Sequence, residues 1–116
     1  MVKVAAGSLY GTLNLLILQS LAEAGPLHGL GIANRIQAVS REVLRIEEGA
    51  LYPALHRLQR GGLLEARWGT SDKGRRAKLY DLTADGRESL AAELGNWHTH
   101  TEAVGRVLGN EAASGS

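Results

Sequence analysis

Residues 63–82 read LLEARWGTSDKGRRAKLYDL. Two segments suited to β-strands, residues 63–68 and 76–82, flank a loop of turn-forming residues at 69–74. Apolar and polar side chains alternate, though imperfectly, along the second segment, as they do in a half-buried strand. The stretch therefore predicts a β-hairpin.

The hairpin is also the most basic part of the chain. Between residues 67 and 78 one acidic side chain, Asp72, stands against five basic ones: Arg67, Lys73, Arg75, Arg76 and Lys78. By itself such a segment is typical both of an edge hairpin guarded by charge and of a wing lying along DNA. The whole chain of 116 residues has a formal net charge of only +1. The chain as a whole is therefore not a polycation, and its positive charge is concentrated in the hairpin.

Two helices and a short strand are predicted upstream. Apolar residues at helical spacing favour helices over residues 8–23 and 28–40, separated by Gly25-Pro26. Residues 43–46 are short and branched, which predicts a minimal strand.

A third helix is predicted between this strand and the hairpin. Glu47-Glu48 suits its N-terminus, where the helix dipole is positive, and Gly61-Gly62 suits its end. Pro53 is expected in or near the first turn, because a proline deeper inside would break the helix.

The predicted order is helix, helix, helix, β-hairpin, long helix. A mainly α chain with a small β-hairpin in this order has the layout of a winged helix-turn-helix followed by a long C-terminal helix. We expect a DNA-binding winged helix-turn-helix domain at residues 1–82 and a dimerisation helix at 83–109. Residues 110–116 are expected to form a disordered tail.

The third helix of such a fold offers its N-terminal half to the major groove. At ~100° per residue, the side opposite the leucine stripe carries Gly49, Pro53, His56 and Arg60, flanked by Tyr52 and Arg57. Ala50 is expected to touch a thymine methyl group, and His56 is expected to contact a base edge or a phosphate. The two arginines and the hydroxyl of Tyr52 are expected to contact phosphates. The alternative is an ordinary solvated helix face.

The C-terminal helix carries a heptad seam formed by Leu90, Leu94, Trp97, Thr101, Val104 and Leu108. The seam is too short for an independent coiled coil, so it is expected to pack on the first helix and on a second copy of the chain. The first helix contributes Leu9, Leu13 and Leu16 to this predicted dimer contact. Trp97 is interpreted either as core or as the place where an aromatic effector stacks. Gly95 and Gly105 permit close helix approach or a break.

Other classes of function find little support. The chain has no Cys, which excludes disulfides, thiolate zinc sites and thiol catalysis. His98, His100 and Glu102 do not share one helix face, so no metal site is expected. No complete dinucleotide, P-loop or hydrolase motif occurs, and we predict no enzyme and no cofactor. The apolar run at residues 15–18 is too short for an export signal or a membrane span, so we expect a cytoplasmic protein.

A family resemblance rests on several motifs. They are Leu27-His28-Gly29, EGALYPALHRL at 48–58, Gly62-Leu63-Leu64, Trp68, Ser71-Asp72, RRAKLY at 75–80 and LTADG at 82–86. In these motifs, which extend over about residues 8–108, the chain resembles the PadR family of bacterial transcriptional regulators. The single C-terminal helix is similar to that of the short subtype.

The resemblance implies a homodimer that represses by binding a palindromic operator in double-stranded DNA and, in some members, is released by a small molecule. It implies DNA contacts at Tyr52 and its neighbours, at His28 and Gly29, and in the wing at Lys73, Arg75, Arg76 and Lys78. A winged-helix protein-interaction module that does not read DNA is the alternative, which the modest net charge keeps open.

Overall fold

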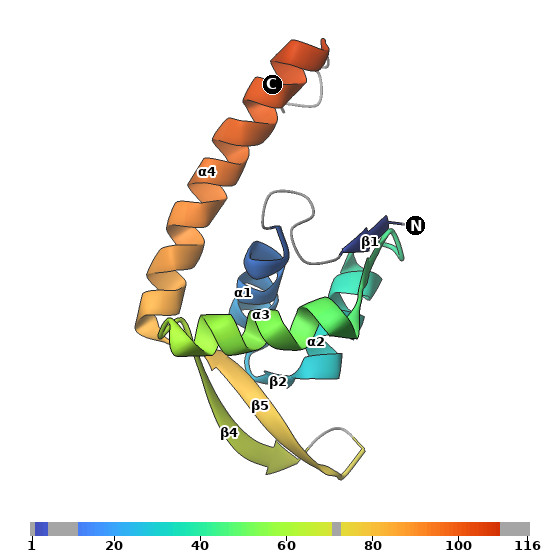
Figure 1. Cartoon of the computed structure of the whole chain (residues 1–116), viewed down its shortest axis with the longest axis vertical. Coiled ribbons are helices and arrows are strands. Elements are labelled where there is room, and N and C mark those ends of the chain that lie inside the picture. Colours follow the sequence, from blue (N-terminus) through green and yellow to red (C-terminus); the bar gives the residue numbers. More distant parts are fainter. Residues whose placement is uncertain (1, 5–11, 71–72, 110–116) are drawn as a thin grey trace.

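The computed structural model describes residues 2–4, 12–70 and 73–109. The elements follow in the order β1 (Val2–Val4), α1 (Thr12–Ala24), β2 (Leu27–His28), α2 (Gly29–Val39), β3 (Leu44–Ile46), α3 (Glu48–Arg60), β4 (Leu64–Thr70), β5 (Arg76–Leu82) and α4 (Ala84–Leu108). The helices form most of the molecule and the β4–β5 hairpin extends away from them (Figure 1). The predicted class, mainly α with a small β-hairpin, is confirmed. The predicted start of the first helix, Leu9 and the tail at 110–116 lie outside the described residues.

The hairpin belongs to a three-stranded antiparallel sheet in the order β2-β5-β4. We expected His28 to open the second helix, but it lies in the two-residue strand β2, where it pairs with Leu79 of β5. A strand of two residues has no readable periodicity, and only the tertiary pairing creates it. This pairing ties the start of α2 directly to the hairpin.

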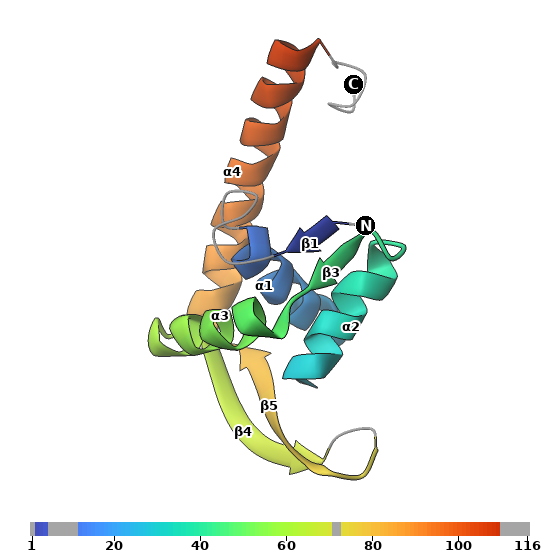
Figure 2. The ribbon, with the colours of Figure 1, turned by 45° about the vertical axis from the view of Figure 1, so that its right-hand side comes forward.

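A second, parallel pair joins β1 to β3, with Val4 opposite Ile46 (Figure 2). The predicted minimal strand is thereby confirmed as β3. Its partner β1 was not predicted, because three residues at the start of the chain carry no pattern that points to a distant partner.

The core is built around α1. Six side chains with less than 2 % exposure form its centre: Ile17, Leu18, Leu21, Ile32, Leu51 and Leu55. Because α1 contacts α2, α3, α4 and β5, its apolar residues on several sides are covered within one chain. Leu13 and Leu90, which we assigned to a dimer contact, are 5 % and 7 % exposed and belong to this same core. We therefore leave both out of the dimer surface.

The end of α3 is set by its glycines. Gly62 has a φ of 79°, and its N–H donates to the carbonyl of Gln59 at 3.0 Å. The N–H of Leu63 donates to the carbonyl of Leu58, also at 3.0 Å. These two bonds form a Schellman motif, so the predicted end of the helix is confirmed.

Pro53 lies inside α3. It is the sixth residue of the helix and lies in its second turn, just past the first turn in or near which we expected it. The bond that its missing N–H leaves unmade would go to the carbonyl of Gly49, and both residues are exposed. Water can satisfy that carbonyl, which is why the helix continues through the proline.

The long helix α4 is fastened to the end of α3. The Thr83 hydroxyl accepts a hydrogen bond from the N–H of Gly86 at 3.0 Å and donates one to the carbonyl of Gly62 at 2.6 Å. α4 then runs without a break for 25 residues, so Gly95 and Gly105 do not interrupt it. Its first part packs on α1 and the rest projects beyond the body of the molecule (Figure 1).

Candidate nucleic-acid interface

The outward face of α3 carries the side chains that the sequence analysis assigned to it. Every one of Gly49, Tyr52, Pro53, His56, Arg57 and Arg60 is exposed. Ala50 is the exception, because it is 5 % exposed and packs in the core. Its methyl group is withdrawn from the surface, and the expected contact with a thymine methyl is removed from the interface.

The ring of Tyr52 packs against Gly29, the first residue of α2. A Cβ atom added to Gly29 would lie 2.8 Å from Cε1 and 3.1 Å from the hydroxyl oxygen of Tyr52. Only glycine allows the ring to approach this closely. The sequence motif that contains Gly29 and the one that contains Tyr52 therefore meet at one point of the surface.

A groove of about 420 Å³ lies between α3, the start of α2 and the hairpin. Its lining includes His28, Gly29, Tyr52, His56, Trp68, Arg76 and Lys78. All of these except Trp68 were predicted DNA contacts, and Trp68 entered the sequence analysis only as a family motif. At the groove's inner end Tyr80 is 3 % exposed. Burial, with a smaller effect of neighbouring Tyr52, raises the pKa of Tyr80.

The other two predicted wing contacts, Lys73 and Arg75, line a second groove of about 460 Å³. Lys73 and Arg75 lie there opposite Asn34 of α2, and Arg76 lines both grooves. Asn34 was not predicted, because one amide on a helix gives no signal until the hairpin is placed beside it.

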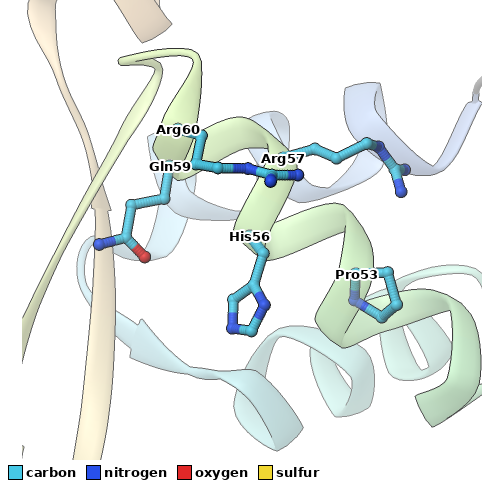
Figure 3. A pocket seen from close by; sticks show the side chains of 5 residues that line it. All are labelled: Pro53, His56, Arg57, Gln59 and Arg60. Carbon is cyan, nitrogen blue, oxygen red and sulfur yellow. The ribbon is translucent and has the colours of Figure 1, made fainter.

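The stretch of α3 from Pro53 to Arg60 presents a shallow concave surface of about 700 Å³. Figure 3 shows its lining side chains projecting from this one helix: Pro53, His56, Arg57, Gln59 and Arg60. Gln59, the one residue of the five that we did not predict, adds an amide to a surface that is otherwise basic.

Four cations of this surface lack an acidic partner inside the part of the chain that the structure describes. Arg57, Arg60, Arg76 and Lys78 have no carboxylate oxygen within 4.0 Å there. The described ion pairs, Arg35–Glu23 and Arg106–Glu102, lie on other elements. The α3 face and the wing thus offer a continuous set of donors to an anionic partner.

A model of the transcriptional regulator PadR-like family matches residues 17–92, from α1 into the first part of α4. The chain belongs to the PadR-like family of transcriptional regulators. The transcriptional regulator Rv3488 of Mycobacterium tuberculosis is 37 % identical over 79 residues, which cover 60 % of this chain and 73 % of that protein. The family resemblance found in the motifs is thereby confirmed.

Solved structures of transcriptional regulators are similar to this chain in sequence and fold. A PadR family transcription regulator from Clostridium difficile R20291 is 28 % identical, with a TM-score of 0.70 over 84 % of this chain and 99 % of that one. A transcriptional regulator from Clostridium thermocellum is 26 % identical, with a TM-score of 0.72 over 80 % of this chain and 89 % of that one. The protein is thus a PadR-family transcriptional regulator with the DNA-binding winged-helix fold, in a family of regulators and not of enzymes.

Within the described ranges, no three His, Asp or Glu side chains gather in a group that could hold a metal ion. None of the described helices combines the length and the apolar character that crossing a membrane requires.

The approach of Tyr52 to α2 gives a first prediction. Gly29→Ala should leave the fold intact, since the clash is with the mobile end of a side chain, but should displace the Tyr52 hydroxyl. If that hydroxyl donates to a phosphate, DNA affinity should fall about tenfold. Fluorescence anisotropy with a labelled duplex measures this. In a Tyr52→Ala background the same glycine change should cost nothing more, and a full additional loss there would show that Gly29 acts independently of Tyr52.

Proposed function

We propose that this protein is a homodimeric repressor that occupies a palindromic operator. The observation that carries the proposal is the division of the molecule into two surfaces. One is the cationic face of α3 and the wing, and the other is the part of α4 that projects from the body of the molecule (Figure 1). The apolar side chains of that part of α4 are exposed in the single chain.

The uncovered side chains of α4 support the dimer. Along the heptad seam Leu94 and Trp97 are partly buried, whereas Val104 is 40 % and Leu108 74 % exposed. Burying the exposed apolar area of such side chains favours association. A second copy of α4 presents the same seam, so the contact is self-complementary, as a two-fold axis requires. Thr101 of the seam and the half-buried Leu16 of α1 complete the proposed dimer surface.

The exposed residues of α3 support a role as recognition helix. Gly49 has open space around it, so the backbone can approach base edges there. His56 lies about two turns beyond Gly49, beside Arg57 and Arg60, which suit phosphates. One such helix discriminates few bases. Two copies, related by a two-fold axis, would read half-sites about one helical turn apart.

The wing supplies a second prediction. Arg76→Ala and Lys78→Ala should each weaken binding to all duplexes, without changing the preferred sequence, because phosphate contacts carry no sequence information. Each lost contact should make the slope of log K against log salt shallower by about 0.9. Titrations at several salt concentrations measure the slope. An unchanged slope in both variants would remove the wing from the interface.

A small aromatic effector is part of the proposal, at Trp97. Its indole is only partly buried, lies in the α4 seam and has the ring of His100 at 6.3 Å between centroids. A ligand stacked there would alter the dimer and so the spacing of the two recognition helices. Aromatic compounds that quench the protein's emission should fail to do so in Trp97→Phe, while quenching that persists in this variant would place the ligand elsewhere.

The stoichiometry of the complex tests the proposed function. Sedimentation of the protein with a palindromic duplex should give two chains per duplex, and transcription in vitro from a promoter that carries the site should fall. One chain per duplex would contradict the dimer, and a rise in transcription would contradict repression.

A further inference from the structure

Trp68 is a large apolar residue on the surface of the wing. It lies in β4, directly opposite Lys78 of β5, and is 61 % exposed. The Arg76 guanidinium carbon lies 4.6 Å from the centroid of its ring. An indole this exposed gains little from burial in the chain itself, so its position calls for another cause.

The pleat of the hairpin determines which way Trp68 faces. Residues two apart on a strand share a face, and directly opposed residues share it too. With Trp68 opposite Lys78 and Thr70 opposite Arg76, these four residues lie on one face of the hairpin. Trp68, Arg76 and Lys78 line the groove together with Tyr52 and His56. The stacked pair therefore stands across the groove from the recognition helix.

Stacking fixes the guanidinium without using up its donors. Arginine places its flat face on an aromatic ring and keeps its edge N–H groups available, which lysine cannot do. A long side chain on an exposed strand otherwise loses much rotamer freedom when it binds. An arginine already held on a ring loses less, and it meets a phosphate in a prepared orientation.

We propose that Trp68 is a positioning residue of the DNA interface: it holds Arg76 against the wing for a phosphate of the backbone that passes through the groove. This inference rests on the proposed function, in which the groove takes the DNA backbone. It adds Trp68 to the interface as an uncharged residue that acts through Arg76.

Lys78 provides a matched control in the same strand. Its ammonium lies 5.7 Å from the ring centroid of Tyr80, and the cation that the structure pairs with Trp68 is Arg76. Trp68 is thus coupled to one of two neighbouring cations. A merely structural role in the hairpin would affect both cations alike.

The experiment is a pair of double-mutant cycles on the full chain, with a fluorescein-labelled duplex of mixed sequence at low ionic strength. Trp68→Leu should weaken binding about fivefold and leave the salt slope unchanged, because no charge is lost. Combined with Arg76→Ala it should add almost nothing, whereas combined with Lys78→Ala the two losses should multiply. Trp68→Phe, which keeps a ring, should restore most of the affinity.

Wild-type affinity in Trp68→Leu would overturn the inference, and so would losses that multiply with both cations. If the wild-type protein does not bind the duplex, both the proposed function and this inference are wrong. Should Trp68→Leu not fold, the emission of the wild type and of Trp68→Phe is compared as duplex is added. Quenching in the wild type that is absent in Trp68→Phe supports the inference, and equal quenching in both overturns it.

Discussion

Replacing Gly86 by alanine should destabilise the protein by about 3 kcal/mol. A Cβ atom at this position would lie 2.1 Å from the carbonyl oxygen of Leu63 and 3.1 Å from its carbonyl carbon. Backbone atoms cannot rotate away as a side-chain end can, so α4 must shift. That shift would strain the bonds of Thr83 to Gly62 and Leu63, which fasten α4 to the end of α3.

Thermal unfolding followed by circular dichroism measures this loss, at about 4–8 °C of Tm for each kcal/mol. Gly95→Ala is the matched control in the same helix, because nothing lies within 4 Å of its added Cβ. It should stabilise the protein by up to about 1 kcal/mol, the difference in helix propensity. A Gly86→Ala protein as stable as the wild type would contradict the described junction between α3 and α4.

Placing charges on the exposed part of the α4 seam should weaken operator binding at least about 100-fold. The double variant Val104→Glu, Leu108→Glu puts two carboxylates where the proposed dimer buries apolar side chains. The variant should be folded and monomeric in sedimentation. Its affinity for a palindromic duplex should fall at least about 100-fold, because the second half-site no longer binds intramolecularly.

Val107→Glu is the control for this variant. Val107 is 86 % exposed on the same turn of helix but lies off the seam, so one added carboxylate there should disturb the dimer far less. A double variant that stays dimeric would contradict the α4 seam, and a monomeric one that keeps full affinity would contradict cooperative reading of two half-sites.

The sequence predicts best those features that are local. Residues 63–82 predict the hairpin because alternation, turn residues and charge all occur within one short stretch. The Schellman end of α3 follows from Gly61-Gly62 for the same reason. The outward face of α3 follows from the spacing of its leucines, since a helix repeats every 3.6 residues.

Tertiary contacts decide the rest. β2 exists only because Leu27 and His28 find a partner in β5. Ala50 lies at the margin of the outward face, where helical periodicity alone does not decide whether a small side chain is covered. Pro53 is tolerated in the second turn because that side of α3 is exposed. The position of Trp68 beside Arg76 depends on the register of the hairpin, which the two strand patterns alone do not fix.

Selection of random duplexes by the purified protein, followed by sequencing, tests the central claim most directly. We expect a palindromic motif whose half-site centres lie about ten base pairs apart. Enrichment of a single, non-repeated half-site would contradict the dimer. Absence of any enriched sequence, at low as well as moderate salt, would contradict operator reading and favour a winged-helix module that binds another protein.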